Sequence, residues 1–338
     1  MRGFRFISTR QIEDFCNMLS ELNVENLGLQ KYQAFYLTNL LIHKKYFVSM
    51  YAQVLNELLM QTEKKNEQIF LIDYGAGNGL LGLFAKSCGF GKVVQVDTSS
   101  AFCFSQEILS EKLRLPVDEN INGDYESLEK FAANPPDALI ATDVIEHIYD
   151  LDKFFSTLQK LNKRLVTVFT TASNDHNFWK KKKLMRIQKK DECEGDVSGD
   201  DFCESFRLVR RNIIKKEIPQ ITNSALERLV IHIRGLRKDD IELACSRYME
   251  NGAIPPLLTH PTNTCDPITG SWTERFLSFK EYKDLFNRYG FSLTIKNGFY
   301  NNFQHGVKGT ILSVLNFLIL KMGKKGSALT PYIILIGC

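Results

Sequence analysis

Residues 69–79 read IFLIDYGAGNG, and this stretch decides how the chain folds. Four apolar residues, Ile69 to Ile72, are followed by an aspartate and then by three glycines at alternate positions. A short apolar run that ends in a glycine-rich turn is typical of a buried strand. The next segment, Leu80 to Lys86, has the length of a short helix, so the pattern predicts a strand, a tight turn and a helix in succession.

Three further apolar runs are followed by polar residues in the same way. They are Val93–Val96 before Asp97, Ala138–Ala141 before Thr142 and Asp143, and Leu165–Phe169 before two threonines. Helical patterns such as Leu151–Leu161 separate them, and this alternation predicts an α/β fold with a doubly wound parallel sheet. Ligands of such sheets bind beyond the carboxyl ends of the strands. Asp73, Asp97 and Asp143 all fall at such ends, so we expect a binding site there.

The alternation is interrupted once, which divides the chain into four predicted parts. They are an N-terminal helical segment (1–65), a core (66–171), a mainly helical insertion (172–277) and the return of the core (278–338). Helical periodicity marks Gln11–Leu22, Tyr46–Leu59 and Lys238–Glu250, and the patterns at Ser224–Glu227 and Ser278–Glu281 fit capping boxes. In the last part we expect a helix that ends at Gly290, strands at Phe291–Ile295 and Tyr332–Ile336, and a helix at Val307–Met322.

Composition excludes several classes of protein. The 338 residues carry a formal net charge of only +4, which is too small to favour nucleic acid as a partner. None of the eight cysteines forms a C-x-x-C pair, and no apolar run reaches the roughly 18–20 residues of a transmembrane helix. Scattered cysteines without a secretory signal predict a cytoplasmic location.

The glycine turn and the residues around it indicate which ligand the site takes. A dinucleotide fingerprint needs a third glycine where this chain has Leu80, and the glycine stands one position earlier, at Gly79. The pattern Asp73-x-Gly75-x-Gly77-x-Gly79 instead resembles class I S-adenosylmethionine (SAM) dependent methyltransferases. Asp97, 24 positions after Asp73, stands where a carboxylate can accept the ribose hydroxyls of a nucleoside.

The segment Asp143-Val144-Ile145-Glu146-His147-Ile148 resembles methyltransferases related to the ubiquinone-biosynthesis O-methyltransferases. The resemblance covers residues 66–170, extends to 278–338 and is absent from the insertion. It implies a Rossmann-like, seven-stranded sheet whose last strand is antiparallel, with SAM as the cofactor. The cofactor-binding residues that it implies are Asp73, Gly75, Ala76, Gly77, Gly79, Asp97, Thr98, Asp124, Tyr125, Asp143 and Val144. For Asp124, a role as an ordinary turn aspartate remains open.

The candidate catalytic residues are His147 and His176, because histidine is the usual proton acceptor near neutral pH. His176 follows the fifth predicted strand, and His260 and His305 are further candidate bases. Asp143, Glu146 and His147 also match the spacing by which some ubiquinone-type relatives bind a divalent metal. We expect local hydrogen bonds of Glu146 and His147 instead, and no metal, because one histidine and two carboxylates do not define a metal site.

The insertion is expected to form a helical cap over a small-molecule acceptor. Trp272–Phe276 would line that site or merely pack the cap. The lysines at 180–183 have three interpretations, in order of preference: a solvated helix face, contact with an anionic substrate, and contact with RNA. Val307–Met322 fits a buried helix, a homodimer contact or a peripheral membrane contact through residues 307–325.

These features predict a SAM-dependent methyltransferase of a small molecule, with O-methylation of a sugar, a quinone-like or a lipid-linked metabolite as the expected reaction. One alternative is an RNA or protein methyltransferase that uses the basic insertion. Another is a non-catalytic regulatory protein that binds SAM. An NAD-dependent enzyme is disfavoured by Leu80 in the third glycine position.

Overall fold

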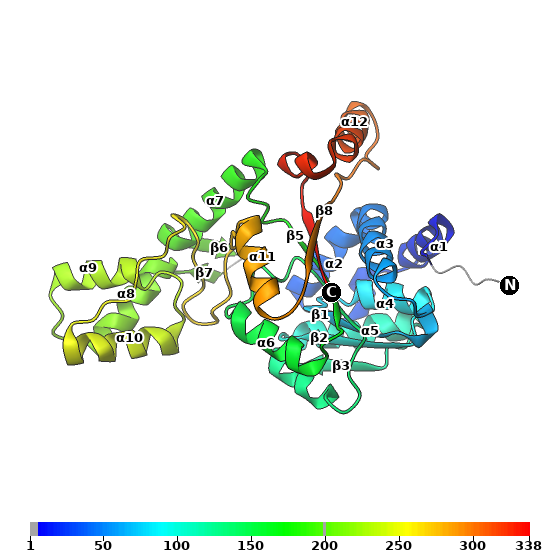
Figure 1. Ribbon diagram of the computed structural model, residues 1–338. Coiled ribbons are helices and arrows are strands. Elements are labelled where there is room, and N and C mark those ends of the chain that lie inside the picture. Colours follow the sequence, from blue (N-terminus) through cyan, green and yellow to red (C-terminus); the bar gives the residue numbers. More distant parts are fainter. Residues whose placement is uncertain (1–5, 199–200) are drawn as a thin grey trace. The chain divides into compact units, whose positions relative to one another are not determined.

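The computed structural model describes residues 6–198 and 201–338 (Figure 1). Residues 1–5 of the predicted N-terminal segment and residues 199–200 of the predicted insertion lie outside the described residues. The chain divides into two compact units. The core unit comprises Met1–Ile145, Asp152–Thr171 and Lys280–Cys338, and the insertion unit comprises Glu146–Leu151 and Ala172–Phe279.

Within the described residues, the core unit contains one seven-stranded sheet, in the order β3-β2-β1-β4-β5-β9-β8. The strands are β1 (Phe70–Tyr74), β2 (Lys92–Asp97), β3 (Glu119–Asn122), β4 (Ala138–Thr142), β5 (Val166–Thr171), β8 (Leu293–Asn297) and β9 (Ile333–Gly337). The neighbours from β3 to β5 pair in parallel, whereas β9 is antiparallel to both β5 and β8. This confirms the predicted Rossmann-like sheet with its last strand antiparallel.

One face of the sheet packs against the N-terminal helices and the helices that follow β1 and β2. These elements are α1 (Thr9–Ser20), η1 (Val24–Leu27), α2 (Lys31–Ile42), α3 (Lys44–Met60), η2 (Asn66–Gln68), α4 (Leu80–Ser87) and α5 (Ser100–Leu113). Leu71 of β1, Val168 of β5 and Leu55 of α3 belong to one buried apolar cluster. The strands are buried on both faces, which explains why they read as continuous apolar runs.

The other face is covered by η3 (Tyr125–Phe131), α6 (Leu151–Leu161) and α11 (Phe279–Arg288), and phenylalanines dominate its packing. Phe155 of α6 lies with its ring centre 4.6 Å from Phe286 of α11 and 6.1 Å from Phe169 of β5. Phe291 joins the same cluster, 5.9 Å from Phe155. The strand predicted at Phe291 therefore begins only at Leu293, because Phe291 packs against the helices.

Helix α1 shows how local chemistry sets a boundary that periodicity alone missed. It begins at Thr9, two residues before the predicted start, because Ser8 caps it. The Ser8 hydroxyl accepts the backbone N–H of Gln11, and the Gln11 side chain accepts the backbone N–H of Ser8.

The insertion unit is built largely of helices, with one small hairpin that the sequence did not suggest. Its elements are α7 (Phe178–Cys193), β6 (Asp196–Ser198), β7 (Asp201–Cys203), α8 (Phe206–Glu217), α9 (Asn223–His232) and α10 (Lys238–Asn251). Helix α9 corrects a prediction, since its cap is Thr222, whose hydroxyl accepts the Ala225 N–H, and not Ser224.

The core unit ends with α12 (Val307–Met322) and η4 (Gly323–Ala328), which lie between β8 and β9 in the chain. Helix α12 has the predicted bounds and is flanked by glycines with positive φ at Gly306 and Gly323. Among the described residues, no helix has both the length and the apolar character that crossing a bilayer requires.

Candidate functional site

The glycine turn after β1 has the backbone geometry that its sequence requires. Gly75, Gly77 and Gly79 have φ values of 66°, 54° and 79°, a region that residues with a β-carbon rarely adopt. The N–H groups of Gly75 and Ala76 donate to the carbonyl of Val96 across 2.8 and 3.1 Å. The turn is therefore attached to the end of β2, and Gly79 forms the N-cap of α4.

Two buried amide side chains, which the sequence pattern did not single out, donate hydrogen bonds to carbonyls of the same turn. Gln95 of β2 donates to the Gly79 carbonyl across 2.6 Å, and Gln106 of α5 donates to the Gly77 carbonyl across 2.8 Å. Both glutamines are fully buried. The one available signal was Gln95 itself, a polar residue inside an apolar run. Because two turn carbonyls are already bonded, the loop has a fixed shape without a ligand.

Asp97 lies at the end of β2 and contacts the turn directly. Its Oδ2 accepts the Gly77 N–H at 2.8 Å, and its Oδ1 accepts the Ser99 N–H at 2.9 Å. Burial raises the pKa of Asp97, although these two backbone hydrogen bonds oppose the rise. Each carboxylate oxygen has a second lone pair that can accept a ligand hydroxyl. The neighbouring Thr98 is exposed at the start of the loop that follows β2.

Asp73 has a different position from the one that the strand-end pattern suggested. It is only 2% exposed and its Oδ2 accepts the N–H of Gly82 in the first turn of α4, at 2.8 Å. Burial raises the pKa of Asp73 to about 7, with the Gly82 hydrogen bond opposing the rise and the charge of Asp97 adding to it. Asp73 therefore holds the start of α4 behind the glycine turn.

Asp124 and Tyr125 form the start of η3, beyond the end of β3. The Asp124 carboxylate accepts the Tyr74 hydroxyl at 2.6 Å and the backbone N–H of Tyr125 at 2.5 Å. Burial and the Asp124 charge raise the pKa of Tyr74, so its hydroxyl stays protonated and keeps donating. Asp124 is thus both a turn residue and an exposed carboxylate fixed by a strand residue.

At the end of β4, Asp143 has a φ of 53°, which is uncommon for a residue other than glycine. Its N–H donates to Thr170 of β5 at 3.0 Å, and its side chain is exposed. Strained backbone of this kind is often found at functional sites. The next residue, Val144, packs against Gly75, so the loops after β1 and β4 are in contact.

An aromatic group on α2 lies over the same edge of the sheet. A β-carbon on Gly77 would meet only Tyr36, at 3.6 Å from its Cε1. Burial raises the pKa of Tyr36 to about 12, and the charges of Asp143 and Asp97 contribute. Tyr32 and Phe102 pack around this ring, with centroids 6.4 and 5.8 Å from it. Helices α2 and α5 therefore supply an aromatic wall that no motif revealed.

The two candidate catalytic histidines lie in the insertion unit. His147 Nδ1 is 2.7 Å from the carbonyl oxygen of Trp272. A carbonyl can only accept, so Nδ1 carries the proton and Nε2 is the nitrogen that can accept one. His176 is exposed and stacks on Phe279, with ring centres 3.8 Å apart. Glu146 is buried and accepts the Ala172 N–H at 3.2 Å, a loop-shaping bond of the expected kind.

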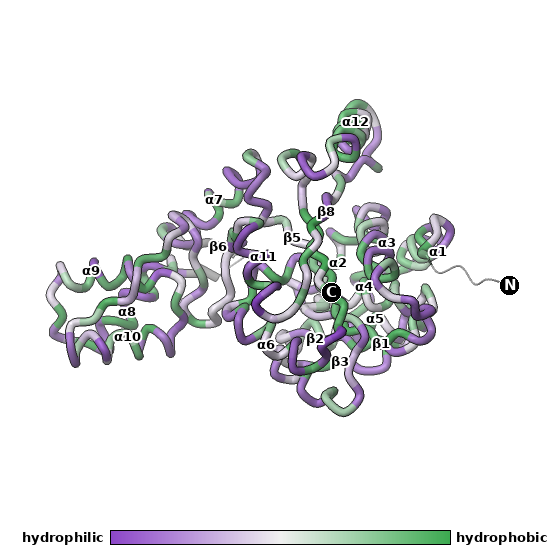
Figure 2. The backbone as a smooth tube through the Cα atoms, in the orientation of Figure 1, coloured by the Kyte–Doolittle hydropathy of each residue, from purple (hydrophilic) through white to green (hydrophobic). Residues whose placement is uncertain are grey.

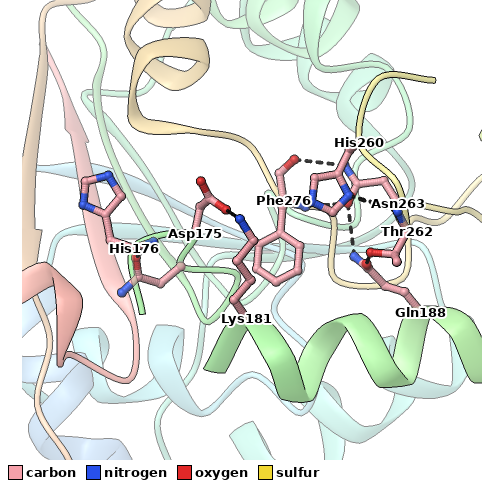
Figure 3. A network of polar contacts seen from close by, with 9 residues as sticks. Asp175, His176, Lys181, Gln188, His260, Thr262, Asn263 and Phe276 are labelled. Carbon is pink, nitrogen blue, oxygen red and sulfur yellow. Dashed lines mark hydrogen bonds and ion pairs between the residues drawn. The ribbon is translucent and has the colours of Figure 1, made fainter. Parts of the chain in front are cut away.

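Figure 3 shows a polar network inside the insertion unit. Gln188 of α7 is fully buried and donates to Asn263 Oδ1 at 3.1 Å and to the Glu274 carbonyl at 2.8 Å. His260 Nδ1 accepts the N–H groups of Thr262 and Asn263, so that nitrogen is not a free base. The network fixes the loop 260–276 onto α7.

Trp272 and Phe276, expected either to line an acceptor site or to pack the cap, pack inside this unit. Trp272 and Phe276 are 5% and 3% exposed, and the Trp272 Nε1 donates to the Tyr149 carbonyl at 3.1 Å. Of the lysine run, Lys181 pairs with Asp175. No group of three or more His, Cys, Asp and Glu residues fit to hold a metal occurs in the part of the chain that the structure describes.

Residues 44–204 match the family model described as a methyltransferase domain. The match includes β1 to β5 and the glycine turn, so this part of the chain is similar to a methyltransferase domain. The core unit also has the seven-stranded sheet with its last strand antiparallel that the resemblance to SAM-dependent methyltransferases implies. The residues present fit SAM, because only Tyr36 lies within 4 Å of the β-carbon position of Gly77, and Asp97 borders the turn at the same glycine. None of the curated proteins is similar to the chain in sequence.

Three solved structures illustrate how far structural likeness extends. The PH0226 protein from Pyrococcus horikoshii OT3 is 21% identical over 49% of this chain and 66% of its own, with a TM-score of 0.33. A mutant of MtNAS in complex with S-adenosylmethionine is 15% identical over 48% and 56%, with a TM-score of 0.33. The precorrin-6y C5,15-methyltransferase from Geobacter metallireducens GS-15 is 15% identical over 42% and 70%, with a TM-score of 0.29. The chain thus spans less than two thirds of the first two structures.

Proposed function

We propose that this protein transfers the methyl group of SAM to an oxygen of a small-molecule acceptor. The observation that supports this most is the contact of Gly77 with Asp97, which joins the open glycine turn to a carboxylate at the end of β2. That carboxylate would accept the ribose hydroxyls, and the turn would receive the amino acid part of the cofactor. Exposed Asp124 and Asp143 would border the same site.

When bound, SAM would supply an activated methyl group: the acceptor oxygen would bond to the methyl carbon while the carbon–sulfur bond breaks, and S-adenosylhomocysteine would leave. The protein's contribution is to hold the acceptor oxygen in line with that methyl group, which can supply much of the acceleration. A hydroxyl keeps its proton at neutral pH, so its attack is assisted by a base. We assign that role to Nε2 of His147, because Nδ1 is committed to Trp272.

The cofactor part of the proposal is tested by calorimetry with S-adenosylhomocysteine on the wild type and on Asp97→Asn. The new amide would place an NH₂ group against the N–H of Gly77 or Ser99, and we expect at least about a tenfold loss of affinity. Asp118→Asn is a matched control, because Asp118 also accepts a backbone N–H, from Val93 at 2.8 Å, but at the opposite edge of the sheet. Equal affinities of all three proteins would refute the assigned site.

Turnover is tested separately, with labelled SAM and a panel of sugar, quinone-like and lipid-linked acceptors. Cofactor binding without transfer to any acceptor would favour the non-catalytic regulatory alternative.

One observation favours a second candidate, an RNA methyltransferase. Phe178 and Trp179 are 64% and 75% exposed directly before the lysines at 180–183, and exposed aromatics beside basic residues suit stacking with bases. Salt-sensitive RNA binding that Trp179→Ala abolishes would support it.

A further inference from the structure

Helix α12 carries an apolar stripe on its exposed side. Val307, Ile311, Val314, Leu318 and Met322 follow one another at intervals of four, three, four and four residues, which places them on one face. Each of the five side chains is at least 42% exposed. Figure 2 colours much of this helix as hydrophobic, and in Figure 1 it lies beyond the end of β8. Exposed apolar surface of this extent marks an interaction site.

The outward direction of the stripe is fixed by the opposite face of the helix. Asn316 accepts the Tyr300 N–H at 2.7 Å and donates to the Tyr300 carbonyl at 2.9 Å. Gly309 packs on the backbone, since a β-carbon there would come within 1.8 Å of the Gln304 carbonyl oxygen. Ile319 is the buried apolar residue of this face. The helix therefore cannot rotate to bury its stripe without breaking the pair at Asn316.

The charged residues near the stripe in the sequence have a single sign. From residue 285 to residue 338 the sequence contains no Asp or Glu. Lys308 and Lys321 lie on α12 itself, and Lys324 and Lys325 follow in η4. All four lysines are exposed, and Lys321 lies over the ring of Phe317, 5.5 Å from its centre.

We propose that α12 binds the surface of a membrane that contains anionic lipids. An apolar stripe with lysines beside it is the pattern of helices that lie in the interface, with the stripe among the acyl chains and the lysines at the head groups. At 1.5 Å per residue its 16 residues extend about 24 Å, too short to span the hydrocarbon core. A second copy paired through this stripe would bring lysines together without a carboxylate from residues 285–338 to neutralise them.

The test is co-sedimentation of the full chain with vesicles of phosphatidylcholine alone and of phosphatidylcholine with phosphatidylserine, at low salt. We expect the wild type to bind the vesicles that contain phosphatidylserine. Combining Ile311→Gln, Val314→Gln and Leu318→Gln should lower this partitioning at least about tenfold, because the apolar contribution is lost. Glutamine keeps the helix propensity of the segment, and circular dichroism checks the fold.

Two control variants make the result specific. Ile42→Gln, Met60→Gln and Phe104→Gln together remove three exposed apolar side chains elsewhere in the core unit and should leave binding unchanged. Lys321→Gln, Lys324→Gln and Lys325→Gln together should weaken binding only to the anionic vesicles. A wild type that stays in solution with both kinds of vesicle overturns the proposal. So does a wild-type dimer that the stripe variant converts to a monomer while neither protein binds vesicles, because the stripe would then be a subunit contact.

Discussion

The side chain of Val144 occupies the space that a β-carbon on Gly75 would need. An ideal Cβ at Gly75 would lie 2.5 Å from Cγ2 and 2.9 Å from Cγ1 of Val144, well inside van der Waals contact. Gly75 also has a positive φ of 66°. Glycine is therefore required at position 75 for two reasons: the positive φ of its backbone, and the lack of space for a β-carbon beside the loop that follows β4.

Gly75→Ala should lower the free energy of unfolding by about 2 kcal/mol or more, since it adds a steric clash to backbone strain. It should also weaken binding of S-adenosylhomocysteine. Gly89→Ala is the control, because Gly89 has a φ of 82° but nothing within 4 Å of its Cβ position, so it reports the strain alone. Urea unfolding and calorimetry measure both effects. Equal losses in the two variants would show that Val144 plays no part.

Asp73 should make the stability of the ligand-free protein depend on pH. Its pKa is raised to about 7 in the folded state, so the folded protein keeps a proton that the unfolded chain releases near its ordinary value of about 4. The stabilising effect is complete below the unfolded pKa and is lost as the pH rises through 7. Relative to Asp73→Asn, the wild type should therefore lose up to about 4 kcal/mol between pH 4 and pH 8.

Urea unfolding over this pH range measures that difference, and Asp118 provides a control of opposite sign. Burial raises the pKa of Asp118, but the Val93 hydrogen bond and Lys86 outweigh it and the pKa is lowered. The stabilising effect of Asp118 should thus be present above the ordinary pKa and lost at lower pH. If wild type and Asp73→Asn gave parallel pH profiles, Asp73 would not be the titrating group.

His147→Ala should lower kcat by about a hundredfold or more and leave the affinity for S-adenosylhomocysteine unchanged, because it removes a base and no cofactor contact. The measurement needs an acceptor from the panel above. His176→Ala is the comparison, since His176 is the other candidate base and is exposed, with its ring stacked on Phe279. A larger loss of kcat for His176→Ala would transfer the catalytic role to His176.

Arg210 of α8 should be needed for the stability of the insertion unit only while Glu192 keeps its negative charge. It is fully buried and pairs with Glu192 of α7, which also accepts the Thr264 hydroxyl at 2.7 Å. Among the described residues, its Nε and Nη1 have no hydrogen-bond partner. Arg210→Met should cost about 3 kcal/mol or more, because a poorly solvated carboxylate loses its cation.

Adding Glu192→Gln to Arg210→Met should restore much of that loss, since the uncompensated charge disappears with its partner. Thermal unfolding of the wild type, both single variants and the double variant completes the cycle. If the effects of the two substitutions simply added, the pair would not be coupled.

The sheet and the glycine turn could be predicted because their signals are local. Apolar runs that end in Asp97 and Asp143 reveal strand ends, and strand ends share one edge of a parallel sheet. The roles of Gln95, Gln106 and Tyr36 could not be predicted, since each acts on a turn far from it in sequence. A buried glutamine can be recognised as an unusual residue, but its partner cannot be predicted. That partner is a backbone carbonyl, which the type of residue does not reveal.

Boundaries and short elements were predicted less well, for physical reasons. Thr222 and Ser224 can both cap a helix, and only the backbone conformation decides between them. The strands β6 and β7 have three residues each, too few for an alternating pattern to emerge. The apolar run suggested that Asp73 follows the first strand, whereas the structure places it within β1, one residue before the end of the strand.

Strand β9 lies between β5 and β8, so that Thr171 pairs with Ile333. The whole segment 172–279 of the insertion unit is synthesised between these two partners. Throughout that time the edge of β5 presents unpaired N–H and C=O groups, a template for pairing with other chains. Closing the sheet is thus a late and long-range event in folding. The growing chain should consequently depend on chaperones and be far more prone to aggregate than the finished protein.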